Sequence, residues 1–184
     1  SVGNAERIRN VANIVKSHVR KKPVVVVSAI TKVTDALIRL AKECAAGRGN
    51  NTLEQIKKVH HEVLGNLGIN RDLLKNDFEQ LVVLANKTKS SRQFNAELLD
   101  NFQSFGERMS SKIVAEQLNM VDVKARAFNS WELGFSTTAD FGDAEPLEIS
   151  YVNLKNNIKK LNVVPVITGF IGKTKNGAIT TLGR

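Results

Sequence analysis

The chain has 184 residues, of which 42% are hydrophobic and 24% charged, a composition typical of one folded domain and not of a disordered tail or a collagen. Cys44 is the only cysteine and no apolar run approaches the roughly 20 residues that span a bilayer, so a disulfide scaffold and a membrane span are excluded and a reduced compartment is expected. The formal charge of +9 at pH 7 fits nucleic acid, an anionic membrane or phosphorylated small molecules as partners, and composition does not choose among them.

Helix and strand patterns alternate at the start of the chain. Apolar residues recur at helical spacing over residues 4–22, which predicts an amphipathic helix that ends before Pro23. Residues 24–27 are four valines, which predict a short strand buried on both faces of a largely parallel sheet. Helical spacing resumes over residues 34–41, with Thr34 or Asp35 as the expected N-cap.

Three helical patterns follow with no strand between them. Residues 53–64, 73–85 and 96–119 each predict a helix, and together they predict an inserted helical layer. Gly106 interrupts the last pattern, where glycine costs about 1 kcal/mol relative to alanine. We therefore expect the chain to turn at residues 104–106 and a new helix to begin near Glu107.

The remaining patterns complete an α/β fold. They predict a half-buried or edge strand over 121–128, a helix over 147–161, a buried strand over 163–171, and a hairpin turn at Asn176-Gly177 into residues 178–181. Strands that alternate with helices predict a three-layer sandwich, in which helices flank a largely parallel central sheet. No repeat or linker divides the chain.

Small and polar residues gather where the predicted strands end or helices begin. They occupy residues 28–35, 104–111 and 168–184. In open α/β sheets the carboxyl ends of the strands form the ligand crevice, so we expect these segments to meet there. Residues 1–4 form a fourth candidate, because a glycine-containing loop that opens a helix presents backbone N–H groups to an anion.

Taken in order, these segments resemble the motif series of the aspartokinases, which are members of the amino acid kinase family. The matching segments are residues 1–7, 25–29 with Thr34 and Asp35, 104–111, 168–172 and 180–184. The resemblance spans the whole chain, and its most specific parts are residues 104–111 and 168–184. Residues 134–142 also resemble an aspartokinase stretch, to which no contact is assigned.

The resemblance implies an amino acid kinase (carbamate kinase-like) fold and an incomplete domain. Family members begin with a strand and a Lys-Phe-Gly-Gly-Thr loop just before the residue matching Ser1, so Ser1 and Gly3 match what remains of a nucleotide-phosphate loop. After the residue matching Arg184 they continue with Gly-Gly-Ser-Asp, a nucleotide-binding lobe and regulatory domains. We therefore expect residues 1–184 to be the N-terminal substrate-binding lobe, with the catalytic lysine and aspartate outside the chain.

The implied reaction transfers the γ-phosphoryl group of ATP, with Mg²⁺, to the β-carboxylate of L-aspartate, the first step toward lysine, threonine and methionine. This nucleophile is already anionic at neutral pH, so no general base is required. The protein must instead orient the substrate and supply positive charge to the transferring group. The resemblance further implies a cytoplasmic homo-oligomer; a plastid location would need a transit peptide.

Five residues match the aspartate pocket of the family. Glu107 matches the family residue that binds the substrate ammonium, and Arg184 matches the one that binds the α-carboxylate. Ser28 and Thr34 match two residues whose hydroxyls line the pocket, and Phe170 matches an aromatic residue behind it. Arginine's planar fork suits a carboxylate better than lysine would. Three of them have a structural alternative: Glu107 as a first-turn glutamate, Thr34 as an N-cap and Ser28 as a strand-end hydroxyl.

Two other functions stay open. One is a nucleic-acid-binding module, suggested by the net charge and by the basic residues of the first helix, but no groove-reading or single-strand motif accompanies them, so we expect no nucleic acid partner. The other is a stand-alone lobe with a binding or regulatory role, which would not phosphorylate aspartate.

His60, His61 and Cys44 do not indicate a metal site. His60 and His61 are adjacent on a predicted helix and point about 100° apart, so they cannot share one metal, and we expect both at the surface. Cys44 lies on the apolar side of its helix and is expected in the core.

Overall fold

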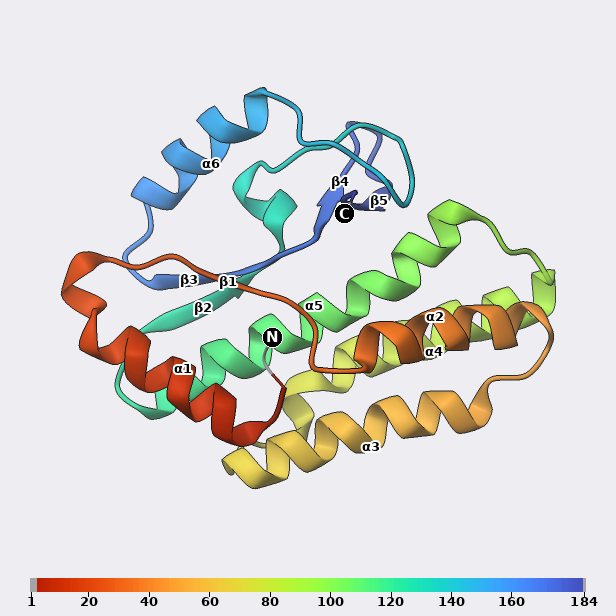
Figure 1. The fold of residues 1–184 in the computed structure, drawn as a ribbon, viewed down its shortest axis with the longest axis horizontal. Coiled ribbons are helices and arrows are strands. Elements are labelled where there is room, and N and C mark those ends of the chain that lie inside the picture. The colour runs from red at the N-terminus through yellow and green to blue at the C-terminus, as the bar shows by residue number, and fades with distance from the viewer. Residues whose placement is uncertain (1–2, 184) are drawn as a thin grey trace.

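The computed structural model describes residues 3–183 (Figure 1), so the predictions for Ser1 and Arg184 lie outside the described residues. Helices and strands alternate at both ends of the chain, and helices alone fill the middle. In chain order the elements are α1 (Ala5–Ser17), η1 (Val19–Lys21), β1 (Val25–Val27), α2 (Val33–Ala45), α3 (Asn50–Leu67), η2 (Arg71–Leu74), α4 (Lys75–Ser91), α5 (Ala96–Met120), β2 (Ala125–Phe128), η3 (Ser130–Leu133), α6 (Ile149–Lys159), β3 (Val164–Thr168), β4 (Ile171–Lys173) and β5 (Ile179–Thr181).

The main sheet has the order β1-β3-β2 and is parallel throughout. All five residues of β3 are buried, as expected for its apolar run. The prediction that the valine strand is buried on both faces is wrong, because Val27 is buried but Val26, whose side chain lies on the opposite face, is 64% exposed. Among the described strands β1 pairs only with β3 and lies at the sheet edge.

Helices cover both faces of this sheet (Figure 1). Val164 and Val166 of β3 pack into the large core shared with α1 and α5, whereas Ile167 packs with Leu154 and Ile158 of α6 on the opposite face. Helices α2, α3 and α4 pack together beyond α5 and form the inserted helical layer. The three-layer sandwich predicted from the sequence is therefore confirmed.

Helix α5 runs unbroken through the middle of the molecule, so the predicted turn at residues 104–106 is wrong. Gly106 lies inside this helix, where a Cβ atom would come within 2.6 Å of the Cβ of Ala29. The missing side chain lets the segment after β1 lie directly on α5. This close packing offsets the weak helix propensity of glycine.

The chain after β3 forms a small second sheet. Strands β4 and β5 are antiparallel, with Gly177 at a φ of +86° in the turn between them, as the Asn-Gly signal predicted. Residues 136–144 lie along this hairpin, with single bridges from Ser136 to Lys173 and from Ala144 to Leu182. Among the helices of residues 3–183, none combines the length and the apolar character needed to cross a membrane.

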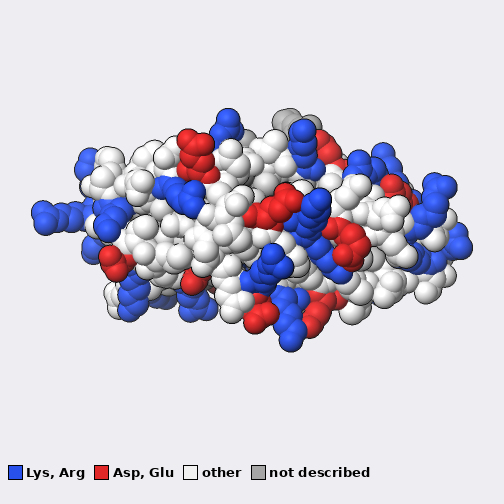
Figure 2. Space-filling model, turned by 90° about the horizontal axis from the view of Figure 1, so that it is seen from below, with Lys and Arg blue, Asp and Glu red and all other residues white. Residues whose placement is uncertain are grey.

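Acidic and basic side chains are mixed on the surface. On the face seen from below Figure 1, the two kinds alternate over the middle and basic side chains gather toward the two ends (Figure 2). Nucleic-acid-binding domains usually carry a continuous basic stripe. This face therefore offers no support for the nucleic-acid alternative.

Candidate substrate site

Glu107 is a buried carboxylate in the middle of α5. Its side chain is 2% exposed, and its Oε1 accepts a hydrogen bond of 3.2 Å from the backbone N–H of Ala29. Its Oε2 is buried and has no hydrogen-bond partner among the described residues. Burial raises the pKa of the carboxyl from 4.5 to about 7, and hydrogen bonds from the backbone N–H groups of Ala29 and Glu107 offset part of that rise.

This environment excludes the structural alternative of a first-turn glutamate. Glu107 lies eleven residues after the first residue of α5, too far for the N-terminal helix dipole to act on it. A buried carboxylate oxygen without a partner is costly, and a cationic ligand group would remove that cost. Glu107 is therefore suited to bind an ammonium group.

The loop between β1 and α2 supplies the N–H group that orients Glu107. Ser28 in this loop is exposed, whereas Ala29 and Ile30 are buried. Lys32 has a φ of +69° and is the N-cap of α2, so the prediction that Thr34 or Asp35 caps this helix is wrong. Thr34 is the second residue of α2 and is half-buried.

Gly3 lies against the same loop. A Cβ atom on Gly3 would come within 2.9 Å of the Thr31 Oγ1. Helix α1 begins two residues later, and its N-cap Asn4 accepts a hydrogen bond of 2.9 Å from the backbone N–H of Arg7. The start of α1 and the loop after β1 are therefore neighbours, as the predicted crevice requires.

Phe170 enters from the carboxyl end of β3. The N–H of Gly169 donates to the Val27 carbonyl at 2.8 Å, which joins the ends of β1 and β3. Phe170 follows with a left-handed φ of +58°, is half-buried, and lines a mostly apolar cavity of about 370 Å³. Its carbonyl accepts a hydrogen bond of 2.9 Å from Leu182, which lies two residues before Arg184.

Comparison with known proteins gives the family. The sequence model of the amino acid kinase family matches residues 1–184. The chain belongs to the amino acid kinase family. It is 34% identical to aspartokinase 2, chloroplastic, of Arabidopsis thaliana, and the match covers 100% of this chain and 36% of that protein. It is 30% identical to an aspartokinase of Geobacillus stearothermophilus, and the match covers 100% of this chain and 34% of that protein. It thus spans about a third of the length of these relatives.

Solved structures agree with this assignment. E. coli aspartokinase III in complex with aspartate and ADP, in its R-state, matches this amino acid kinase chain with a TM-score of 0.83 and 28% identity, covering 100% of this chain and 42% of that one. The T-state of the same enzyme, with lysine and aspartate, matches with a TM-score of 0.82 and 27% identity over the same shares. The predicted resemblance and fold are confirmed.

The structure places four of the predicted site segments at one edge of this kinase fold. They are the Gly3 segment, the loop with Ser28, the middle of α5 with Glu107, and the segment with Phe170. The Ala29 N–H could not be found from the sequence, because no side chain identifies it. Asp100 was also not among the predicted residues, because the expected turn at residues 104–106 hid its position two helical turns before Glu107 on one helix.

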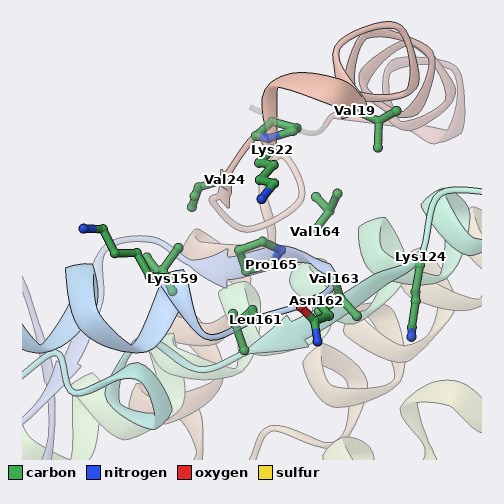
Figure 3. Close-up of a pocket in the computed structure, with 12 residues that line it drawn as sticks. Val19, Lys22, Val24, Lys124, Lys159, Leu161, Asn162, Val163, Val164 and Pro165 are labelled. Atoms are coloured by element: carbon green, nitrogen blue, oxygen red, sulfur yellow. The ribbon is translucent and has the colours of Figure 1, made fainter.

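A larger cavity lies elsewhere. Its volume is about 550 Å³, and it adjoins the amino ends of β1 and β3, opposite to the predicted crevice (Figure 3). Lys22 points into it, whereas Lys124 and Lys159 extend away in different directions. No carboxylate is among its described lining residues. It therefore lacks the pair of opposite charges that an amino acid would require.

The described residues contain no group of three or more His, Cys, Asp or Glu that could hold a metal ion. His60 is fully buried, and the prediction that it lies at the surface is wrong. It packs edge-on against Phe78, bonds through Nδ1 to the Ile56 carbonyl at 2.7 Å, and burial lowers its pKa to about 4. Cys44 is in the core, as predicted.

Proposed function

We propose that this chain is the substrate-binding part of an aspartokinase, which transfers the γ-phosphoryl group of ATP to the β-carboxylate of L-aspartate. The single observation that carries the proposal is the unpartnered Oε2 of Glu107, buried at the edge where the motif segments meet. The similarity to E. coli aspartokinase III, solved with aspartate and ADP, supports the same substrate.

Glu107 and Arg184 divide the recognition of aspartate between them. The Glu107 carboxylate accepts hydrogen bonds from the substrate ammonium, and the Ala29 N–H holds that carboxylate in one orientation. Arg184 binds the α-carboxylate. With both ends of the zwitterion bound, the β-carboxylate is presented to the phosphoryl donor without any proton transfer.

Ser28, Thr34 and Phe170 shape the rest of the pocket. Ser28 is exposed and directly precedes Ala29, so its hydroxyl lies next to the segment that orients Glu107. Phe170, at the carboxyl end of β3, is the proposed aromatic at the back of this pocket, although the apolar cavity that it lines includes neither Ser28 nor Thr34. An apolar wall there would exclude water and strengthen the charge pairs that hold the substrate.

ATP with Mg²⁺ is the proposed co-substrate. Mg²⁺ in such sites is usually held by one or two carboxylates together with phosphate oxygens of the nucleotide. Ser1 and Gly3 belong to the proposed phosphate-binding loop. We further propose that the whole enzyme is a homo-oligomer and acts at the start of lysine, threonine and methionine synthesis. The A. thaliana relatives are named chloroplastic, and a cytoplasmic location for this protein stays a prediction.

The proposal is tested by Glu107→Gln in the whole protein that contains this chain. Loss of a charge-assisted hydrogen bond should raise the KM for aspartate by about 10- to 100-fold and leave the KM for ATP within about twofold. The matched control is Glu116→Gln on the same helix, which should change neither value. An unchanged dependence on aspartate in Glu107→Gln would contradict the proposed site.

A further inference from the structure

Asp100 connects three separate segments of the chain. It lies on α5 and is fully buried. Its Oδ2 accepts hydrogen bonds of 2.9 Å from the backbone N–H groups of both Gly142 and Thr181, and its Oδ1 accepts one of 2.7 Å from the Thr181 hydroxyl. One carboxylate therefore joins α5, the loop around Gly142 and strand β5.

The position of Asp100 on α5 relates it to the candidate site. It precedes Glu107 by seven residues, which is two helical turns, so the two carboxylates share one face of the helix about 10 Å apart along its axis. Asp100 holds Thr181, and Arg184 follows Thr181 by three positions in the sequence. The next residue, Leu182, donates to the Phe170 carbonyl at 2.9 Å, so the anchor at Asp100 also fixes the end of β5 against the Phe170 segment.

The loop around Gly142 holds β5 from its other side. The hydroxyls of Thr137 and Thr180 are 2.6 Å apart, and the Ala144 N–H donates to the Thr181 carbonyl at 3.0 Å. Ala144 also forms a bridge to Leu182. With Ala144, residues 134–142, to which their resemblance to aspartokinases assigned no contact, therefore help to hold β5 on α5.

We propose that Asp100 is a positioning residue for aspartate binding. It sets the separation between Glu107, which binds the substrate ammonium, and the segment after Thr181, which carries the arginine for the α-carboxylate. This inference rests on the proposed function. Asp100 does not touch the substrate; it acts by fixing β5 relative to α5.

Two substitutions separate the geometry of this anchor from its charge. In Asp100→Ala, the N–H groups of Gly142 and Thr181 lose their acceptor. In Asp100→Asn, the amide oxygen can still accept from both N–H groups, while the amide NH₂ donates to the Thr181 hydroxyl after that hydroxyl rotates. The asparagine variant therefore preserves the position of β5.

The experiment measures steady-state kinetics and amide hydrogen exchange of both variants in the whole protein. Asp100→Ala should raise the KM for aspartate about tenfold, with the KM for ATP within about twofold, because a misplaced clamp weakens only the substrate that it binds. Exchange should accelerate at residues 136–144 and 179–183. Asp100→Asn should stay within about threefold of the wild-type KM for aspartate.

The matched control is Thr52→Val, which removes a buried hydroxyl that donates to Glu43 at 2.7 Å between α3 and α2. A merely structural loss should resemble this control. The positioning role is refuted if Asp100→Ala raises the two KM values equally, or raises the KM for aspartate no more than Thr52→Val does.

Further outcomes separate this inference from the proposed function. If Asp100→Ala does not fold, Thr181→Val removes only the hydroxyl donor and should raise the KM for aspartate about threefold; an unchanged value refutes the inference. If Glu107→Gln raises the KM for aspartate and Asp100→Ala does not, the inference alone fails. If Glu107→Gln leaves it unchanged, the proposed function fails, and this inference with it.

Discussion

Replacing Glu107 by glutamine should change how stability depends on pH. Burial raises the pKa of this carboxyl from 4.5 to about 7 in the folded state. The folded protein therefore binds a proton more tightly than the unfolded chain does. The stability from this proton is complete below pH 4.5, decreases as the pH rises, and is lost above about pH 7.

The magnitude follows from the size of the pKa change. A rise from 4.5 to about 7 corresponds to about 3 kcal/mol over the full range, and to roughly 2 to 3 kcal/mol between pH 5 and pH 8. Glutamine does not titrate. The free energy of unfolding of Glu107→Gln, relative to wild type, should therefore increase by this amount from pH 5 to pH 8.

Urea denaturation at several pH values measures this difference directly. The control is Glu97→Gln, an exposed glutamate on the same helix, which should keep the wild-type pH dependence. A constant difference between Glu107→Gln and wild type across the pH range would show that the Glu107 carboxyl is neither desolvated nor unpartnered, and would remove the basis of the candidate site.

Three further predictions follow from the same geometry. The KM for aspartate should rise by up to about tenfold for each pH unit below 7 as Glu107 takes up a proton, while the KM for ATP stays level; a flat aspartate profile contradicts the assignment. Gly106→Ala should destabilise the protein by about 1 to 3 kcal/mol, because the new Cβ would lie 2.6 Å from the Cβ of Ala29. Gly65→Ala, where no atom lies within 4 Å of the new Cβ, should stabilise the protein by about 0.5 to 1 kcal/mol. Equal effects of the two substitutions in a denaturation assay would argue against close packing at Gly106. The 184-residue chain alone should form no aspartyl phosphate with ATP, and detection of the product as its hydroxamate would contradict the proposal that this chain is only the substrate-binding part.

Local patterns predicted the elements whose stability depends on their own residues. The apolar stripes of α3 and α4 identified both helices, and the Asn-Gly pair identified the β4–β5 hairpin. Their signals lie within one or two helical turns or within one tight turn. The family motifs then located the segments that meet at the candidate site.

The error at the start of α2 was local, since the helix is capped by Lys32 and not by Thr34 or Asp35. Other errors and omissions concern contacts between residues far apart in the sequence. Gly106 was predicted to break a helix, but its partner Ala29 lies 77 positions away and makes glycine the residue that fits. The burial of His60 depends on Phe78 from the next long helix. The acceptor role of Asp100 depends on Gly142 and Thr181. None of these partners is visible in a local window.

The edge position of β1 affects how the chain will behave when it is purified alone. Val26 of β1 is 64% exposed and the preceding Val24 is 42% exposed, and β1 has one unpaired side among the described strands. Unpaired, apolar strand edges template intermolecular β-pairing. Preparations of the isolated piece should therefore gel or precipitate at millimolar concentration, more readily at high ionic strength, where salt screens the mutual repulsion of its positive charge.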